Sequence, residues 1–577
     1  MKRANKNNLW AYITILIVAI IMCVPLMQKG IQASHDGDFH ISRAIGTIEQ
    51  LEKGESPFVV ARFSNELGFG WNLFYPPINT AINVIFAVLT GNAIFAMKLF
   101  IFFTFFLSGI TMYQFVLEIS KNKVAAIFSS LLYMIAPYRL LNVYTRLAVG
   151  EMVSFIFIPM IFRGVYLIFK EKTEKSYLFI LGAIGLILSH NISTMLVCII
   201  GVVYIVMNIK KLKNPKIIKT FCASAVIIIL SVIFFEIPLL EQKFSAEYEV
   251  FRYGKMYSRE LVRDRGINPL QLLMKNVPFL DGTMYFCIGL PLLIGAFLTP
   301  IAIKRLDKEK KKDYKFFLVV GIVSCFMATF IFPWYYMPEI FLMIQFPWRM
   351  LEIVVFCFSI ISGINFAIMI PVWLEKRKKA NLKLVETVVL ILFCLYSISF
   401  FKTIEWKNID DNHYQEKEII DTTNYVSRYS SFLEYWPQKA IDSINYITNR
   451  DNKILVLNGE ALIESEEKDG GILTFYIKAE NANLELPYLF YKGYQAQYKD
   501  ENGNIKKLEL IESDKGLVQL VVTEPIEGEV TVEYHATTLH KICIWISGVT
   551  IVGYSTYLII LWIKKKNNKK QEIKFLP

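Results

Sequence analysis

Long apolar blocks alternate with short lysine-rich runs along most of the chain. The blocks hold about 17 to 25 residues, which is the length that an α-helix needs to cross the hydrocarbon of a bilayer. Within hydrocarbon, only a helix or a closed barrel satisfies every backbone amide. The 577 residues are 54% hydrophobic, and their mean hydropathy is +0.41. We therefore predict a mainly α-helical protein that crosses a membrane many times.

The formal net charge of +12 does not predict a nucleic-acid partner, because the lysines lie in short runs between apolar blocks. Basic residues in such loops set the orientation of the spans and contact anionic lipids. The eight cysteines lie in or beside apolar blocks and form no CxxC pair, so we predict neither a disulfide framework nor a zinc site. Phosphate-loop, nucleophile-elbow and zincin motifs are also missing from the sequence.

Placing every basic run in the cytoplasm predicts about twelve crossings with both termini inside. The expected spans are 9–27, 93–118, 124–138, 150–169, 177–189, 191–209, 217–240, 283–303, 316–333, 350–374, 384–401 and 541–563. The apolar piece 76–90 is too short for a comfortable span, and a crossing there would reverse all later loops. We predict instead a helix that lies along the external leaflet, with Pro76 and Pro77 in its first turn.

The chain then divides into a transmembrane domain over 1–401, whose first external loop is 28–92, and an extracytoplasmic domain over 402–540. Residues 402–450 of that domain are expected to be helical or irregular. Alternating apolar and polar residues bounded by tight-turn sequences predict an antiparallel β-sandwich over 451–536. A final span, 541–563, and a basic cytoplasmic tail, 564–577, complete the chain.

The segment that follows the first span carries the most suggestive chemistry. Asp36 and Asp38 flank Gly37, and His35, His40 and Arg43 lie beside them. Asp36 suits the N-cap of a helix whose next turns carry His40 and Arg43, and plain capping is one interpretation. The other is that one aspartate acts as a general base or a metal ligand beside the membrane. The sequence supports the second because acids and histidines gather here directly after a span.

Four further motifs fall on the same predicted external face. They contain Tyr75 in the aromatic run 68–77, Arg146 and Glu151 in the run 144–151, His190 in Ser189–Asn191, and Arg349 in the run 345–349. Each has a structural interpretation: an aromatic belt, a salt bridge between helix ends, a broken helix or an anchoring turn. Arg252, Arg259, Arg263 and Arg265 are also predicted to be external, where orientation does not explain them. Guanidinium groups bind phosphate in a bidentate way, so an anionic lipid headgroup is the natural ligand.

These motifs together resemble the GT-C superfamily of membrane glycosyltransferases. The resemblance is narrower to bacterial membrane proteins with the 6-pyruvoyl-tetrahydropterin synthase-related domain, through residues 35–43, 68–77, 144–151, 189–191 and 346–349. The run 486–494 also resembles the external domain of YfhO-like proteins. The resemblance covers most of the chain and implies a GT-C-like fold in the bacterial cytoplasmic membrane.

The resemblance also implies an activity: transfer of a sugar from a polyprenyl-phosphate carrier to an envelope glycan, teichoic acid, lipid or protein. Asp36 or Asp38 would be the catalytic carboxylate, which acts as a base that deprotonates the acceptor or holds a divalent ion such as Mg²⁺ or Mn²⁺. Arg146 and Arg349 would neutralise the phosphate. The remaining candidate substrate contacts are His35, His40, Arg43, Tyr75, Glu151 and His190. The sequence leaves open which aspartate is the base.

Two other functions fit the same sequence. A lipid-linked oligosaccharide flippase would move the carrier lipid across the bilayer without making a glycosidic bond. A non-catalytic assembly protein would use its β-domain to bind envelope partners. Ion-coupled transport is disfavoured, because acids in the middle of the predicted spans are nearly absent.

Overall fold

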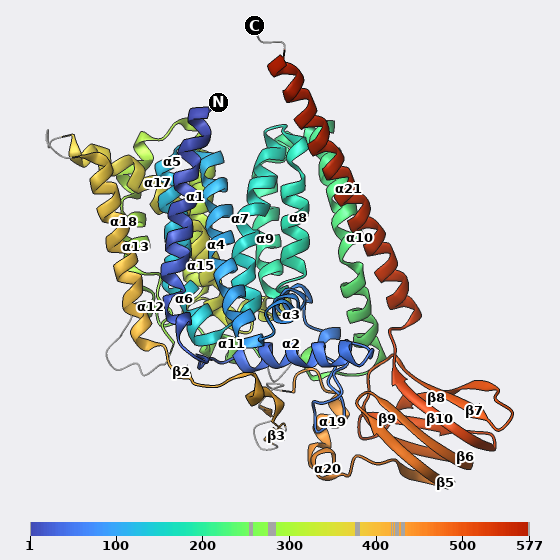
Figure 1. The fold of residues 1–577 in the computed structure, drawn as a ribbon. Helices are drawn as coiled ribbons and strands as arrows, with labels where there is room; N and C mark the ends of the chain where they lie inside the picture. Colours follow the sequence, from blue (N-terminus) through green and yellow to red (C-terminus); the bar gives the residue numbers. More distant parts are fainter. Residues whose placement is uncertain are drawn as a thin grey trace.

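A computed structural model of the chain describes residues 2–252, 258–274, 284–375, 381–416, 418, 420, 421, 426, 427 and 433–574. Parts of three predicted segments therefore lie outside the described residues: the first residue of the span 283–303, several residues of 402–450, and the last three residues of the tail. The described chain forms a bundle of long helices with a β-domain at one end (Figure 1).

The helices in chain order are α1 (Lys2–Met22), α2 (Gly37–Glu52), α3 (Ile78–Thr90), α4 (Ala93–Ser120), α5 (Lys123–Ile135), α6 (Pro137–Leu141), α7 (Val149–Phe169), α8 (Tyr177–Ile187), α9 (Asn191–Met207), α10 (Pro215–Ser245), α11 (Arg259–Asp264), α12 (Pro269–Leu273), α13 (Leu290–Phe297), α14 (Thr299–Ala302), α15 (Lys308–Met327), α16 (Glu339–Leu342), α17 (Met350–Leu374), α18 (Leu382–Ile398), α19 (Gln438–Asp442), α20 (Ile444–Asn449) and α21 (Thr538–Lys574).

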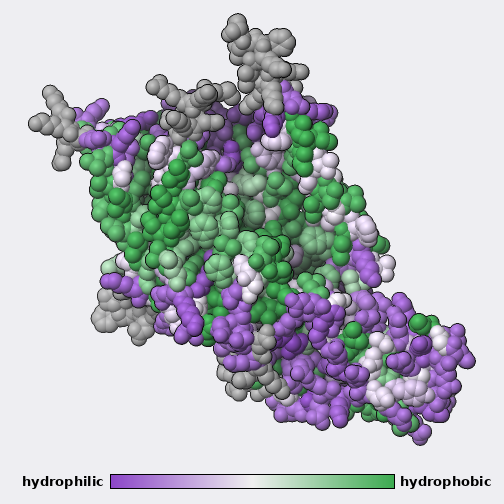
Figure 2. Space-filling view, viewed as in Figure 1, coloured by the Kyte–Doolittle hydropathy of each residue, from purple (hydrophilic) through white to green (hydrophobic). Residues whose placement is uncertain are grey.

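The bundle is that of a membrane protein. Within the described residues, seven helical segments are long and apolar enough to cross a bilayer, and α1, α3 and α9 are shorter apolar helices. An apolar belt separates two polar ends of the molecule (Figure 2). The expected number of twelve crossings stays a prediction. Where we expected a span over 283–303, the described residues form only the short helices α13 and α14.

Both termini lie at one end of the bundle and the β-domain lies at the other (Figure 1). Helix α2 runs across the β-domain end, with α3 beside it. Helix α3 coincides closely with the short apolar helix expected at 76–90, and it ends at Gly91 with φ 66°. Glycine has no Cβ to clash in this left-handed conformation, so it ends the helix without strain.

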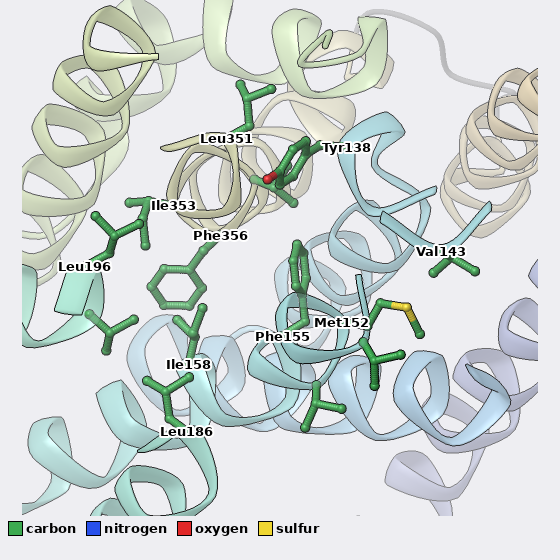
Figure 3. Packing of buried hydrophobic residues seen from close by; sticks show 14 of the residues in the cluster. Tyr138, Val143, Met152, Phe155, Ile158, Leu186, Leu196, Leu351, Ile353 and Phe356 are labelled. Atoms are coloured by element: carbon green, nitrogen blue, oxygen red, sulfur yellow. The ribbon is translucent and has the colours of Figure 1, made fainter. Parts of the chain in front are cut away.

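The interior of the bundle is built around α17, which packs against α5, α7 and α15. Ile158 of α7, Leu196 of α9 and Phe356 of α17 meet in this layer (Figure 3). Phe162 stacks on Phe356 with a centroid distance of 5.2 Å. Close packing of this kind fixes the helix ends that carry the polar residues described below.

The β-domain contains β5 (Leu455–Asp469), β6 (Ile472–Leu489), β7 (Tyr494–Asp500), β8 (Ile505–Glu512), β9 (Leu517–Val522) and β10 (Ile526–Tyr534). Short strands β1 (Ile31–Gln32), β2 (Trp406–Lys407), β3 (Ile420–Asp421) and β4 (Val426–Ser427) lie outside it. Strand β1 pairs with β2 and so ties the segment before α2 to the segment that leads to the β-domain.

We expected two stacked sheets, but the six strands of this domain form one sheet that closes on itself. The order is β10-β7-β8-β9-β6-β5, and β10 also pairs with β6. The cause is the length of β6. Its residues 473–479 pair with β10, and residues further along it pair with β9. One long strand therefore belongs to both sides of a barrel-like sheet.

Candidate functional site

Asp36 lies where the chain passes from β1 into α2. Its backbone N–H donates to the carbonyl oxygen of Arg146 at 2.8 Å, and the N–H of His35 donates to that of Thr145 at 3.1 Å. Asp36 is the N-cap residue of α2, but its side chain makes no capping hydrogen bond. Capping therefore does not explain this carboxylate, which is half-buried beside the start of α7.

Glu151, in the first turn of α7, gathers four donors at the same end of the bundle. Its Oε1 accepts from Nη1 of Arg146 at 2.9 Å and from Nε of Arg349 at 3.2 Å. Its Oε2 accepts from the hydroxyl of Tyr138 at 2.7 Å and from Nδ2 of Asn142 at 3.0 Å. Because Glu151 is only 1% exposed, it is the buried counter-ion that holds both guanidinium groups in place.

Arg146 is the last residue of a π-helical turn, Asn142–Arg146, which positions its side chain beside Glu151. Such turns are rare and often occur at functional sites. Nη1 of Arg146 also donates to Oδ1 of Asn142 at 2.9 Å. The same nitrogen thus donates to both Asn142 and Glu151, so its hydrogen bonds are already made within the protein.

Arg349 and Arg265 lie over the ring of Phe346. Their Cζ atoms are 5.0 Å and 4.6 Å from the ring centroid. Nη1 of Arg349 donates to the carbonyl oxygen of Ile344 at 2.9 Å and to Oε1 of Gln345 at 2.6 Å. Arg265 pairs with no carboxylate among the described residues. Burial and the charge of Arg349 lower the pKa of Arg265, as expected where two cations lie close together.

Asp38 has a different environment from Asp36. Its Oδ2 accepts from Nζ of Lys407 at 2.8 Å, and its Oδ1 accepts from the hydroxyl of Tyr414 at 3.1 Å. Both partners belong to the segment between the bundle and the β-domain. Asp38 therefore fastens that segment to α2, and both of its oxygens are occupied.

His40 and Arg43 face inward from α2 and contact Tyr75. The ring centroids of His40 and Tyr75 are 5.6 Å apart, and burial lowers the pKa of His40 to about 3. Nε of Arg43 donates to Oδ1 of Asn72 at 2.8 Å, and Nη2 donates to the carbonyl oxygen of Tyr75 at 3.0 Å. Burial also lowers the pKa of Arg43, to about 10. Arg43 thus fixes the loop before α3 to α2.

The rings of Tyr75 and His190 approach the start of α7 closely because residue 150 is a glycine. A Cβ atom built on Gly150 would lie 2.8 Å from Cδ2 of His190 and 3.1 Å from the hydroxyl oxygen of Tyr75. Any larger residue would push these rings away. Nδ1 of His190 also hydrogen-bonds the hydroxyl of Ser193 at 2.8 Å.

Two acidic residues near the site were missed by the sequence analysis. Glu352 on α17 is 1% exposed, and its Oε2 accepts from Ser193 at 2.6 Å. Glu434 belongs to the segment before the β-domain and is within electrostatic range of Asp36 and Arg349. The spacing of Glu352, three residues after Arg349, could have signalled one turn of a shared helix face. No sequence pattern points to Glu434.

Burial raises the pKa of Asp36 above its ordinary value. Arg146, His35 and Arg349 act in the opposite direction, and the negative charge of Glu151 adds to the rise. His35 is exposed and contributes only through its position beside Asp36. The result is a more basic carboxylate next to fixed positive charge.

The described residues contain no group of three or more His, Cys, Asp or Glu side chains placed to hold a metal ion. Asp36 and Asp38 do not form a shared ligand pair, because Asp38 is bound to Lys407 and Tyr414. A divalent ion bound through Asp36 would need further oxygen ligands.

Comparison with known proteins finds a relative in sequence and, among others, the following similar solved structure. The chain is 24% identical over 617 aligned residues to an uncharacterized protein of Lactococcus lactis subsp. cremoris (strain MG1363), and the alignment covers 99% of this chain and 98% of that one. The crystal structure of ArnT from Cupriavidus metallidurans bound to undecaprenyl phosphate aligns with a TM-score of 0.37 and 15% identity, over 68% of this chain and 75% of that chain. No known family model matches the chain.

Proposed function

We propose that this protein is a GT-C-type glycosyltransferase. It transfers a sugar from a polyprenyl-phosphate carrier to a hydroxyl group of a cell-envelope acceptor at the outer face of the cytoplasmic membrane. Both termini are then cytoplasmic and the β-domain is external. The observation that carries the proposal is Asp36, a carboxylate with a raised pKa, no capping bond and two arginines nearby.

In this reaction Asp36 is the general base. Its carboxylate takes the proton of the acceptor hydroxyl as the oxygen attacks the anomeric carbon of the sugar. The bond from that carbon to the phosphate oxygen breaks, and the polyprenyl phosphate leaves with the electron pair. The anomeric configuration is therefore inverted. Because the leaving group is already good, the protein mainly positions the base and neutralises phosphate.

We assign the phosphate contact to Arg349 and Arg265, whose guanidinium groups share the ring of Phe346. Arg265 is the better candidate for binding phosphate, because its guanidinium group forms no ion pair with a carboxylate among the described residues. Arg146 is a positioning residue: it bonds Glu151, and its carbonyl oxygen anchors the N–H of Asp36. Tyr75 and His190 complete the wall of the site.

Asp36→Asn tests the proposal, with Asp38→Asn as the matched control. In a deletion strain complemented with each variant at equal protein level, we expect Asp36→Asn to lower envelope glycosylation by about 100-fold or more, the usual contribution of a general base. The lipid-linked sugar should accumulate. Asp38→Asn should instead lower the thermal stability of the purified protein. Unchanged glycan in the Asp36→Asn strain would refute the catalytic assignment. Lipid transfer across proteoliposomes without a new glycosidic bond would favour a flippase.

A further inference from the structure

Glu434 lies outside the helix bundle but within electrostatic range of Asp36 and Arg349. It belongs to the segment that joins the bundle to the β-domain, and its backbone is held against the chain that follows α10. The carbonyl oxygen of Glu434 accepts from the N–H of Val250 at 2.7 Å, and the N–H of Glu249 donates to the carbonyl oxygen of Trp436 at 3.2 Å. These two hydrogen bonds fix the backbone of Glu434 against the chain that follows α10.

Its two neighbours strengthen this placement. The ring of Tyr435 stacks on Phe74 at a centroid distance of 5.5 Å and an interplanar angle of 9°. The carbonyl oxygen of Tyr435 accepts from the hydroxyl of Tyr491 at 3.0 Å, and Nε1 of Trp436 donates to Oγ of Ser64 at 2.9 Å. Residues of the loop between α2 and α3, and Tyr491 just after β6, therefore contact the two residues that follow Glu434.

The carboxylate of Glu434 is half-buried, and no described residue donates a hydrogen bond to it. The charged groups that face it are Asp36, Glu249 and Arg349. Burial and the negative charge of Asp36 raise the pKa of Glu434 to about 7, and Arg349 acts in the opposite direction. The negative charges of Asp36 and Glu434 oppose each other, because two like charges close together disfavour the charged form of each group.

Asp36 and Glu434 are thus two electrostatically coupled carboxyl groups, and neither side chain accepts a hydrogen bond from a described residue. A carboxylate only accepts hydrogen bonds, and leaving one unpaired in a poorly solvated site is costly. A ligand that brings two hydroxyl groups to neighbouring positions would satisfy both acids. Sugars carry such pairs of hydroxyl groups, whereas simple lipid alcohols and serine side chains do not.

We propose that Glu434 is the acceptor-positioning residue of this site and that the acceptor is a carbohydrate. Glu434 accepts a hydrogen bond from one hydroxyl of the acceptor sugar, while Asp36 takes the proton of the neighbouring hydroxyl. This inference rests on the proposed glycosyl transfer. The two acids then have different roles. Asp36 is needed for any transfer, whereas Glu434 is needed only for the choice of acceptor.

The test compares the wild type with Asp36→Asn, Glu434→Ala, Glu434→Gln and the control Glu405→Ala, which removes an exposed acid from the same segment. Each full-length protein is reconstituted with a lipid extract of the native membrane as the source of donor. The acceptor probes are methyl glycosides, which offer adjacent hydroxyls, and n-octanol, which offers one. Transfer to water is measured as release of free sugar.

We expect the wild type and Glu405→Ala to prefer the methyl glycosides by about tenfold or more, the range for a hydrogen bond to a charged group. Glu434→Ala should lose that preference while keeping transfer to octanol and water, which also shows that it is folded. The preference should change with pH near 7 in the wild type and stay constant in Glu434→Gln. An unchanged preference in Glu434→Ala would overturn the inference. Loss of Mg²⁺-dependent transfer to every probe in that variant would also overturn it, in favour of a cation site. Full activity of Asp36→Asn would instead refute the proposed function.

Discussion

Glu151 is the side chain on which the geometry of the candidate site depends most. It bonds Arg146 and Arg349, which belong to different parts of the chain, and it also accepts from Tyr138 and Asn142. A buried acid with two cationic partners contributes little net stability but cannot be neutralised without cost, because the cations are then left uncompensated. Glu151 was predicted from the sequence as a substrate contact, and in the structure its two oxygens accept from four protein donors.

We expect Glu151→Gln to lower the free energy of unfolding by about 3–5 kcal/mol, the range for breaking a buried ion pair. Tyr138→Phe removes only one of the four donors and should cost about 1.5–3 kcal/mol. Thermal unfolding of the purified proteins in detergent measures both. Equal unfolding temperatures for Glu151→Gln and the wild type would show that Glu151 is not the counter-ion of the two arginines.

At the scale of elements, α3 is the helix whose pattern of exposure is most informative. Its buried residues include Asn79 and Asn83, at 2% and 3% exposed, and Nδ2 of Asn79 donates to the carbonyl oxygen of Ser189 at 2.8 Å. Its exposed residues are apolar, with Val88 at 65% and Leu89 at 76%. This is the reverse of the pattern on a helix that faces water. A helix with polar residues inside and apolar residues outside fits one that rests in lipid.

A spin label placed on α3 tests this interpretation. In a variant without the eight native cysteines, a label at Leu89 should be relaxed by oxygen, which concentrates in lipid, and poorly by a water-soluble nickel chelate. A label at Asn502, which is exposed in the β-domain, is the control and should respond in the opposite way. Equal access of the nickel chelate to both labels would place α3 in water.

At the scale of the whole molecule, the β-domain is docked on the loop between α2 and α3. The N–H of Leu489 donates to the carbonyl oxygen of Leu67 at 2.8 Å, and that of Gly471 donates to Oε2 of Glu55 at 2.9 Å. Gly70 lies close against the ring of Tyr491. A Cβ atom built there would lie 2.8 Å from the ring of Tyr491. The φ angle of Gly70 is −93°, so space rather than backbone conformation requires glycine.

Gly70→Ala should therefore loosen the docked domain and cost about 1–3 kcal/mol, as overpacking usually does. Gly553→Ala is the control, because nothing lies within 4 Å of a Cβ atom there. Thermal unfolding and limited proteolysis report the change. In the double variant with Tyr491→Leu the two effects should be less than additive, since the smaller side chain makes room. Additive effects would mean that Gly70 and Tyr491 do not meet.

The sequence by itself determined the features that depend on local composition. Apolar blocks predicted the helical membrane protein, because about 20 apolar residues can leave water together as a helix. Period-two alternation predicted the antiparallel strands, and Asp36 and Gly37 predicted the start of α2. These signals lie within a few residues of one another, so no knowledge of distant segments is needed to interpret them.

Only the tertiary structure decided which polar residues meet. Asp36 and Asp38 look equivalent in the sequence, but Lys407 and Tyr414 occupy Asp38 and leave Asp36 free. Glu434 has no sequence signal, and its position is set by the hydrogen bond that its carbonyl oxygen accepts from the N–H of Val250. The closed sheet likewise depends on β6 pairing with both β9 and β10. The physical reason is common to all three: contacts between distant segments are set by how the chain packs, and local patterns do not record them.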